Sequence, residues 1–256
     1  MINVQITGDT SLPRLVLLHG WGMSSEVWMP VVDKLAQNFC VQTIDLPGLG
    51  ASLVSDKVES LEQVAGWLVE EVDAPAIWLG WSLGGNIAMQ VAAMAPEKVK
   101  ALITVATNPS YVEKSDWQEA MASGVYQAFY DDVAAKGPAA LARFLMLMVQ
   151  GSTDARSLTR QLKPMIKSDH ADRWQLLETL GLLEHDCRPL LDQVSAPQLH
   201  ILGAKDPLVP ASAYHATVKS YPDAQCELFE QSGHLPFLSE PDRFVAAVAD
   251  FSGKVS

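Results

Sequence analysis

The chain has 256 residues, and its 18 Lys and Arg against 30 Asp and Glu give a net charge of −12. Proteins that bind nucleic acid normally present a basic surface to the phosphates, so this charge argues against such a partner. The apolar fraction of 48% is typical of a globular chain, and this length is expected to form one domain.

The predicted elements alternate between strands and helices along most of the chain. Apolar runs bounded by turn residues predict strands over 2–7, 14–18, 41–45, 76–81, 100–106, 198–203 and 224–229. Helical spacing of apolar residues predicts helices near 26–36, 60–72, 83–95, 211–219 and 241–252. This alternation is typical of an α/β fold with a doubly wound, mostly parallel sheet.

The alternation stops between residues 109 and 189, where the patterns are helical and no strand is predicted. We therefore expect a helical cap insertion over 109–189, between a first part of the core over 1–108 and a second part over 190–256. An insertion after the carboxyl end of a strand lies on the side where α/β sheets bind ligands, which favours a lid over a site. Extra packing helices on the flank of the sheet are the alternative.

The strongest single signal is the pentapeptide 80–84, Gly-Trp-Ser-Leu-Gly, between a predicted strand and a predicted helix. The pattern G-x-S-x-G in this context places a serine on a sharp turn, with its hydroxyl exposed above the sheet. The glycines on either side let the helix approach the strand. Ser82 is therefore the predicted catalytic nucleophile; a serine that only caps the helix is the alternative.

A serine nucleophile needs a general base and an acid that orients it, and in this topology the acid and then His follow the serine. Of six histidines, only His215 and His234 come late enough. His215 lies in a helical pattern, whereas His234 follows the last predicted strand, so His234 is the predicted base.

Asp206 is the predicted catalytic acid, because it lies in a tight turn directly after the strand over 198–203. Of the three rival acids, Asp192 precedes this strand and Asp223 looks like a turn residue. Glu230 is so near to His234 in the chain that it would have to reach back along its own loop. An ordinary turn residue is the alternative use of Asp206.

Acyl transfer also needs backbone N–H donors for an oxyanion, one of them from the residue after the nucleophile. Leu83 supplies that N–H, and Trp21, in the glycine-rich turn after an early strand, supplies the second. His19 precedes this turn and is expected to make structural hydrogen bonds. The turn over 45–52 lacks a phosphate-binding pattern and no metal-binding spacing occurs, so we expect neither cofactor nor metal.

Five segments carry a resemblance to a known family over nearly the whole chain: 19–22, 45–52, 80–85, 203–209 and 233–241. With these segments the chain resembles the α/β-hydrolase superfamily. Trp21, Trp78, Trp81 and the segment 142–145 make it similar to the BioH-type carboxylesterases of biotin synthesis. This resemblance implies a serine esterase that hydrolyses pimeloyl-acyl carrier protein methyl ester to the free acid and methanol.

Two other functions stay open at this point. One is a broad short-chain carboxylesterase or another metabolite hydrolase of the same fold. The other is a non-catalytic binding module built on the hydrolase scaffold, which an intact set of serine, histidine and aspartate disfavours.

The charge is distributed unevenly along the chain. Residues 133–168 hold six basic side chains and one acid, a charge of +5, so the remainder carries −17. Helical spacing places four basic residues on one face, although Pro164 is expected to end or kink the helix: Arg156, Arg160, Lys163 and Lys167. Acyl carrier proteins are strongly acidic, so we expect carrier contacts from Arg143, Arg156, Arg160 and Lys163. A solvated charged face is the alternative.

Apolar side chains beside the nucleophile and in the cap are expected to hold a seven-carbon acyl chain. The residues predicted to bind substrate are Trp21, Ser82, Leu83, Phe144, Leu145, Met146, Leu147, Met148 and His234, with Trp81 beside them. Phe144 and Met148 are four apart and can face the same way on a helix. Ordinary core packing is the alternative for each cap residue.

The longest unbroken apolar runs, 144–149 and 244–249, are much shorter than the roughly 20 residues that span a bilayer, so we expect no membrane segment. The first residues lack the features of a secretory signal. The three cysteines are scattered and odd in number: Cys40, Cys187 and Cys226. We therefore expect a cytoplasmic monomer.

Overall fold

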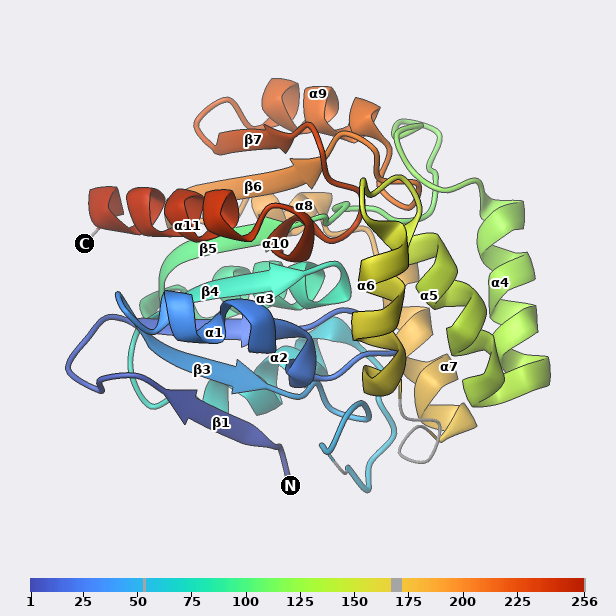
Figure 1. Ribbon diagram of the computed structural model, residues 1–256, viewed down its shortest axis with the longest axis horizontal. Helices are drawn as coiled ribbons and strands as arrows, with labels where there is room; N and C mark the ends of the chain where they lie inside the picture. The colour runs from blue at the N-terminus through green and yellow to red at the C-terminus, as the bar shows by residue number, and fades with distance from the viewer. Residues whose placement is uncertain (53, 167–171, 256) are drawn as a thin grey trace.

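Figure 1 shows the computed structural model, which describes residues 1–52, 54–166 and 172–255. Lys167, one of the basic residues singled out above, lies outside the described residues.

Seven strands form one sheet in the order β1-β3-β2-β4-β5-β6-β7. Their bounds are β1 (Val4–Thr7), β2 (Arg14–Leu18), β3 (Cys40–Ile44), β4 (Ala76–Trp81), β5 (Val99–Val105), β6 (Gln198–Gly203) and β7 (Gln225–Phe229). β1 pairs antiparallel with β3, and every other neighbouring pair is parallel. The predicted doubly wound, mostly parallel sheet is therefore confirmed.

Helices cover both faces of the sheet, which is why the central strands are apolar at nearly every position. One face carries η1 (Ser25–Trp28), α1 (Met29–Leu35), α10 (Pro236–Ser239) and α11 (Pro241–Val255). The other face carries α2 (Leu61–Glu70), α3 (Leu83–Met94) and α8 (Arg188–Leu191). The short helix η2 (Pro96–Lys98) comes directly before β5. Helix α9 (Ala211–Ser220) packs on β6 and β7. None of the helices in the described ranges is both long and apolar enough to cross a membrane.

An aromatic cluster fills the layer between the sheet and the pair α1 and α11. The ring centroid of Phe237 lies 4.4 Å from that of Trp28, 5.4 Å from Trp81 and 6.0 Å from Phe244. All four side chains are fully buried. Full burial of one such side chain contributes about 1.5–3 kcal/mol, so this cluster fixes the layer firmly.

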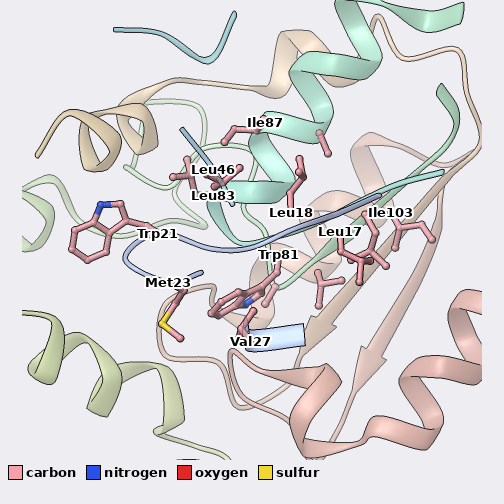
Figure 2. Close-up of a cluster of buried hydrophobic side chains, with 14 of the residues drawn as sticks. Leu17, Leu18, Trp21, Met23, Val27, Leu46, Trp81, Leu83, Ile87 and Ile103 are labelled. Atoms are coloured by element: carbon pink, nitrogen blue, oxygen red, sulfur yellow. The ribbon is translucent and has the colours of Figure 1, made fainter. Parts of the chain in front are cut away.

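The turn at the end of β4 contributes to both layers of the core. Figure 2 shows Trp81 and Val27 on one side of the strands, and Leu83 and Ile87 of α3 on the other. Each of these four side chains is fully buried. The residues that flank Ser82 are thus anchored in opposite layers, which fixes the turn between them.

Between β5 and β6 the chain forms helices beyond the carboxyl ends of the parallel strands (Figure 1). They are α4 (Ser123–Lys136), η3 (Gly137–Ala140), α5 (Leu141–Val149), α6 (Ala155–Leu162), η4 (Lys163–Met165), α7 (Arg173–Gly181) and η5 (Leu182–Glu184). The described part of this segment has no strand and two isolated β-bridges, Val112–Met121 and Lys114–Trp117. We call the segment the cap; its limits at 109 and 189 stay a prediction.

Two glycine substitutions test the packing at the turn. A Cβ on Gly80 would lie 2.1 Å from the carbonyl oxygen of Gly84, so we expect Gly80→Ala to destabilise the fold by about 3 kcal/mol or more. A Cβ on Gly66, in the interior of α2, would have no atom from outside its own helix within 4 Å. Gly66→Ala should stabilise the protein by about 0.5–1 kcal/mol, because alanine is the better helix former. Melting temperatures of the two variants should therefore move in opposite directions; a Gly80→Ala protein as stable as the parent would contradict the packing.

Candidate active site

Ser82 lies on the turn that leads from β4 into α3. Its backbone φ is 55°, a left-handed conformation that costs an L-residue about 1–2 kcal/mol. Neighbouring groups hold the turn, since Ser82 N–H donates to the Val105 carbonyl at 2.9 Å and the Thr107 hydroxyl donates to the Ser82 carbonyl at 3.3 Å. The strain therefore persists only because the surrounding structure fixes it, and it keeps Ser82 on the lining of a cavity.

His234 and Asp206 come together from the loops that follow β7 and β6. His234 Nδ1 lies 2.7 Å from Asp206 Oδ2, and both side chains are fully buried. The other carboxylate oxygen, Oδ1, accepts the backbone N–H groups of Leu208 and Val209 at 2.8 and 3.0 Å. A carboxylate only accepts, so Nδ1 carries the imidazole proton and Nε2 presents a lone pair.

The second nitrogen of His234, Nε2, is buried and has no hydrogen-bond partner in the part of the chain that the structure describes. Trp81 Nε1 donates to the His234 carbonyl at 2.8 Å, which anchors the loop from below. His234 and Ser82 line the same cavity. A buried imidazole nitrogen with an unused lone pair, on a cavity that a serine hydroxyl also lines, is suited to accept the proton of that hydroxyl.

The rival candidates lie elsewhere. Each is exposed, and none makes a hydrogen bond to His234: Asp192, Asp223 and Glu230. His215 is an exposed residue on α9, as its helical pattern indicated. Of the acids considered from the sequence, Asp206 alone contacts His234.

The backbone N–H groups of Trp21 and Leu83 donate to no other described group. The turn that holds Trp21 packs tightly around the serine, because a Cβ on Gly20 would lie 3.2 Å from the Cβ of Ser82. A Cβ on Gly84 would lie 2.5 Å from a carbonyl oxygen of β2. The two N–H groups therefore belong to backbone segments that meet at Ser82, and they are free to donate to an oxyanion there.

His19 ties two turns together. Its Nε2 accepts the Leu46 N–H at 2.9 Å, so its Nδ1 carries the proton and donates to the Gly20 carbonyl at 2.8 Å. Burial lowers the pKa of His19, which keeps the imidazole neutral. His19 thus makes structural hydrogen bonds between the turn at 19–22 and the turn at 45–52.

A cavity of about 520 Å³ lies above Ser82, between the carboxyl edge of the sheet and the cap. Most of its lining is apolar, and the polar side chains on it are Ser82, Tyr111, Tyr126, Arg143 and His234. The size and composition are those of a pocket for a small, largely apolar ligand. No cluster of His, Cys, Asp or Glu that could hold a metal ion occurs in the described ranges.

The predicted substrate-binding residues divide into two groups. Trp21, Phe144 and Leu147 line the cavity together with Ser82 and His234. The side chains of the others do not: Met146 is 56% exposed, and Leu83, Leu145, Met148 and Trp81 are buried and do not line the cavity. Phe144 and Met148 are both buried on α5, but of these two only Phe144 lines the cavity. On α5 the cavity face repeats at Phe144 and Leu147, three residues apart, and Met148 turns into the core.

Several cavity residues were not predicted from the sequence. They come mainly from α4 and from the loops after β5 and β6: Tyr111, Met121, Val125, Tyr126, Phe129, Leu180, Leu183, Pro207, Leu208 and Pro210. Val125 and Phe129, four apart, gave a helical signal that could have identified the α4 face. Tyr111 lies in an irregular loop, where no sequence periodicity marks it.

The predicted carrier-contact residues lie on the cap. Arg143 lines the cavity with a side chain that is 72% exposed, and its guanidinium lies 4.0 Å from Asp132. Arg156 and Arg160 are exposed on α6, which packs against α5, and Lys163 is exposed directly after it. The α-helix ends at Leu162, ahead of Pro164, and continues as η4. Within the part of the chain that the structure describes, no ion pair joins Arg156, Arg160 or Lys163 to an acidic side chain.

Comparisons with known proteins identify the family. Residues 13–241 match the family model of the alpha/beta hydrolase fold. A pimeloyl-acyl carrier protein methyl ester esterase of Vibrio parahaemolyticus is 38% identical over 242 residues, which cover 94% of each chain. The esterase of the same name from Nitrosomonas europaea is 38% identical, over 96% of this chain and 97% of its own.

Solved structures of low sequence identity share the fold. A bromoperoxidase from Bacillus anthracis gives a TM-score of 0.89 at 20% identity, over 98% of this chain and 95% of that one. An enol-lactonase from Burkholderia xenovorans LB400 gives 0.85 at 21% identity, over 98% and 96%. The chain belongs to the α/β-hydrolase family, and within it to the family of the pimeloyl-acyl carrier protein methyl ester esterases.

Proposed function

We propose that this chain is a serine carboxylesterase that hydrolyses the methyl ester of pimeloyl-acyl carrier protein in biotin synthesis. The observation that carries the proposal is the buried pair of His234 and Asp206, whose unused Nε2 lies at the cavity that Ser82 also lines. The relatives in the family supply the identity of the ester.

Acylation begins when His234 Nε2 accepts the proton of the Ser82 hydroxyl, and Oγ bonds to the ester carbonyl carbon. The carbonyl electrons move onto its oxygen, which accepts hydrogen bonds from the Trp21 and Leu83 N–H groups. Asp206 holds the imidazolium through Nδ1. When the intermediate collapses, the bond to the methoxy oxygen breaks, and this oxygen takes the Nε2 proton and leaves as methanol.

Deacylation uses the same groups in reverse. His234 Nε2 accepts a proton from water while the water oxygen bonds to the acyl carbon. The bond from the acyl carbon to Ser82 Oγ then breaks, and Oγ recovers the proton from Nε2. The products are the free carboxylate of the carrier-bound pimeloyl chain and methanol, and the enzyme returns to its starting state.

The acyl chain is proposed to lie against the apolar walls of the cavity. The ring of Trp21 makes edge-to-face contacts with two phenylalanines. Its centroid lies 5.0 Å from that of Phe144 and 5.4 Å from that of Phe129. Trp21 Nε1 donates to the Leu176 carbonyl of α7 at 3.0 Å, so the indole has no polar group left for the ligand. These side chains offer contact area to methylene groups without competing for the ester.

The basic side chains of the cap are proposed to receive the acidic carrier. Arg143 reaches the cavity, and Arg156, Arg160 and Lys163 extend the positive charge across α6 and η4. Exposed ion pairs contribute about 0.2–1 kcal/mol each, so this surface should accelerate encounter more than it tightens binding. A monomeric, cytoplasmic enzyme is part of the same proposal; Cys40, Cys187 and Cys226 are free thiols.

Asp206→Asn tests the triad. The amide oxygen can still accept the Leu208 and Val209 N–H groups, which turns the NH₂ group toward His234 Nδ1 and moves the imidazole proton to Nε2. The base is then blocked, and kcat should fall about 10⁴-fold in a p-nitrophenyl ester assay. Asp223→Asn, at an exposed position, is the matched control and should keep the parent activity. Equal activity of Asp206→Asn and the parent would remove Asp206 from the mechanism.

Methanol release from carrier-bound and free pimelate methyl ester tests the substrate. We expect a higher kcat/KM for the carrier-bound ester, an advantage that shrinks with added salt because exposed charges are screened. Arg156→Glu should reduce kcat/KM for the carrier-bound ester about two- to tenfold and leave the free ester unchanged. Lys254→Glu, with the same charge change on α11 far from the cap, is the control (Figure 1).

Equal rates for the two esters, insensitive to salt and to Arg156→Glu, would favour a broad short-chain esterase instead. Ser82→Ala should lower kcat about 10⁶-fold with either ester, and undiminished turnover would contradict an esterase of any kind at this site.

A further inference from the structure

The Ser82 hydroxyl has a neighbour that the mechanism above does not use. Tyr111, in the loop after β5, places its hydroxyl oxygen 3.3 Å from Ser82 Oγ and 3.3 Å from the Ala106 carbonyl oxygen. Tyr111 is 5% exposed and lines the active-site cavity. A polar group is therefore held directly against the predicted nucleophile.

The backbone around Tyr111 is fixed by contacts distant in the chain. The Tyr111 carbonyl accepts the Met121 N–H at 3.0 Å, and the Pro109 carbonyl accepts the Cys187 N–H at 2.7 Å. The tyrosine ring packs in a small buried cluster with Leu202, Val209 and Ala213. The ring thus packs against β6 and against the loop after it, which also carries Asp206.

The Ala106 carbonyl is held in place as firmly as the backbone around Tyr111. Ala106 has a φ of 46°, a left-handed conformation for a residue with a Cβ, and its N–H donates to the Ile201 carbonyl at 2.8 Å. Backbone strain of this kind persists only where the surroundings impose it. The Tyr111 hydroxyl is therefore held between the Ala106 carbonyl oxygen and Ser82 Oγ, and the backbone of both residues is fixed.

The proton count of these three oxygens limits what Tyr111 can do. A phenol has one proton and can donate it to one acceptor at a time. The Ala106 carbonyl can only accept, whereas the Ser82 hydroxyl can accept or donate. When Ser82 directs its own proton to His234 Nε2, Oγ has a free lone pair, and Tyr111 is in place to donate to it.

We propose that Tyr111 is a further catalytic residue, whose hydroxyl donates a hydrogen bond to Ser82 Oγ while that oxygen carries developing negative charge. The inference rests on the proposed function and adds a third donor to the two backbone N–H groups. It acts twice in each turnover: as the Oγ proton passes to His234 Nε2, and as the bond from the acyl carbon to Oγ breaks. Tyr111 keeps its proton throughout, and when Oγ is protonated again the phenol returns to the Ala106 carbonyl.

Burial keeps the phenol in the form that can donate. It raises the pKa of Tyr111 well above the ordinary value, and the nearby Asp206 carboxylate raises it further. The neutral phenol is thereby favoured over a phenolate beside Ser82. Tyr111 is thus a donor and not a second base.

The test is Tyr111→Phe, which removes the hydroxyl and keeps the ring in its cluster. A hydrogen bond to a buried charged oxygen changes a rate by about tenfold to a hundredfold, so kcat with p-nitrophenyl acetate should fall by that factor. KM and the pH midpoint of kcat/KM should match the parent, because the cavity walls, His234 and Asp206 are intact. A general loosening of the site would instead shift both.

Tyr221→Phe is the matched control, since it removes a hydroxyl that lies 3.3 Å from the Arg188 carbonyl, away from the cavity. We expect this variant to keep the parent kcat. A Tyr111→Phe protein with kcat within twofold of the parent, or above it, would overturn the proposal. If the parent and Tyr221→Phe hydrolyse no ester, the proposed function itself has failed, which is a separate result.

A second replacement covers the case in which Tyr111→Phe does not fold. Incorporation of 3-fluorotyrosine at position 111 keeps the packing and makes the phenol a stronger donor. Donation by Tyr111 predicts a kcat above that of the parent at a pH where the phenol stays protonated. A kcat equal to or below that of the parent would contradict donation by Tyr111.

Discussion

The close approach of α3 to the end of β4 is the constraint on which the rest of the site depends. A Cβ on Gly80 would lie 2.1 Å from the Gly84 carbonyl oxygen, so the contact requires glycine. The same approach forces Ser82 into a left-handed conformation and starts α3 directly after its hydroxyl, where the helix N-terminus favours negative charge. Trp81 and Leu83, buried in opposite layers, supply the packing that offsets this strain (Figure 2).

The loops that carry His234 and Asp206 are pressed together by similar contacts. A Cβ on Gly203 would lie 2.0 Å from the Gly233 carbonyl, so the ends of β6 and β7 are locked as a unit. The cap joins this unit, because a Cβ on Gly151, between α5 and α6, would lie 2.0 Å from the Lys205 carbonyl. The helix α6, which carries Arg156 and Arg160, therefore begins a few residues after the contact between Gly151 and the loop of Asp206. Carrier docking and acyl transfer, as proposed, take place on one connected surface.

Much of this arrangement could be predicted from the sequence, for reasons that differ between its parts. The strands could be located because their apolar runs are local signals, and Ser82, Asp206 and His234 because chain order and turn residues restrict each choice. The cavity walls could not, since Leu145, Met146 and Met148 share an apolar helix with Phe144 and only tertiary packing decides which face meets the ligand. Tyr111 gave no signal at all, because bonds to residues far along the chain set the course of its loop. The net charge of −12 likewise concealed a basic segment of +5, which became visible when the charge was summed along the chain.

The proposed mechanism requires that Ser82 becomes covalently acylated with His234 as its base. Reaction of the protein with a fluorophosphonate, followed by intact-mass measurement and peptide mapping, detects this nucleophile. We expect one adduct per chain, located on Ser82, absent from Ser82→Ala and formed far more slowly in His234→Ala. Modification of a different residue, or labelling of Ser82→Ala at the parent rate, would contradict it.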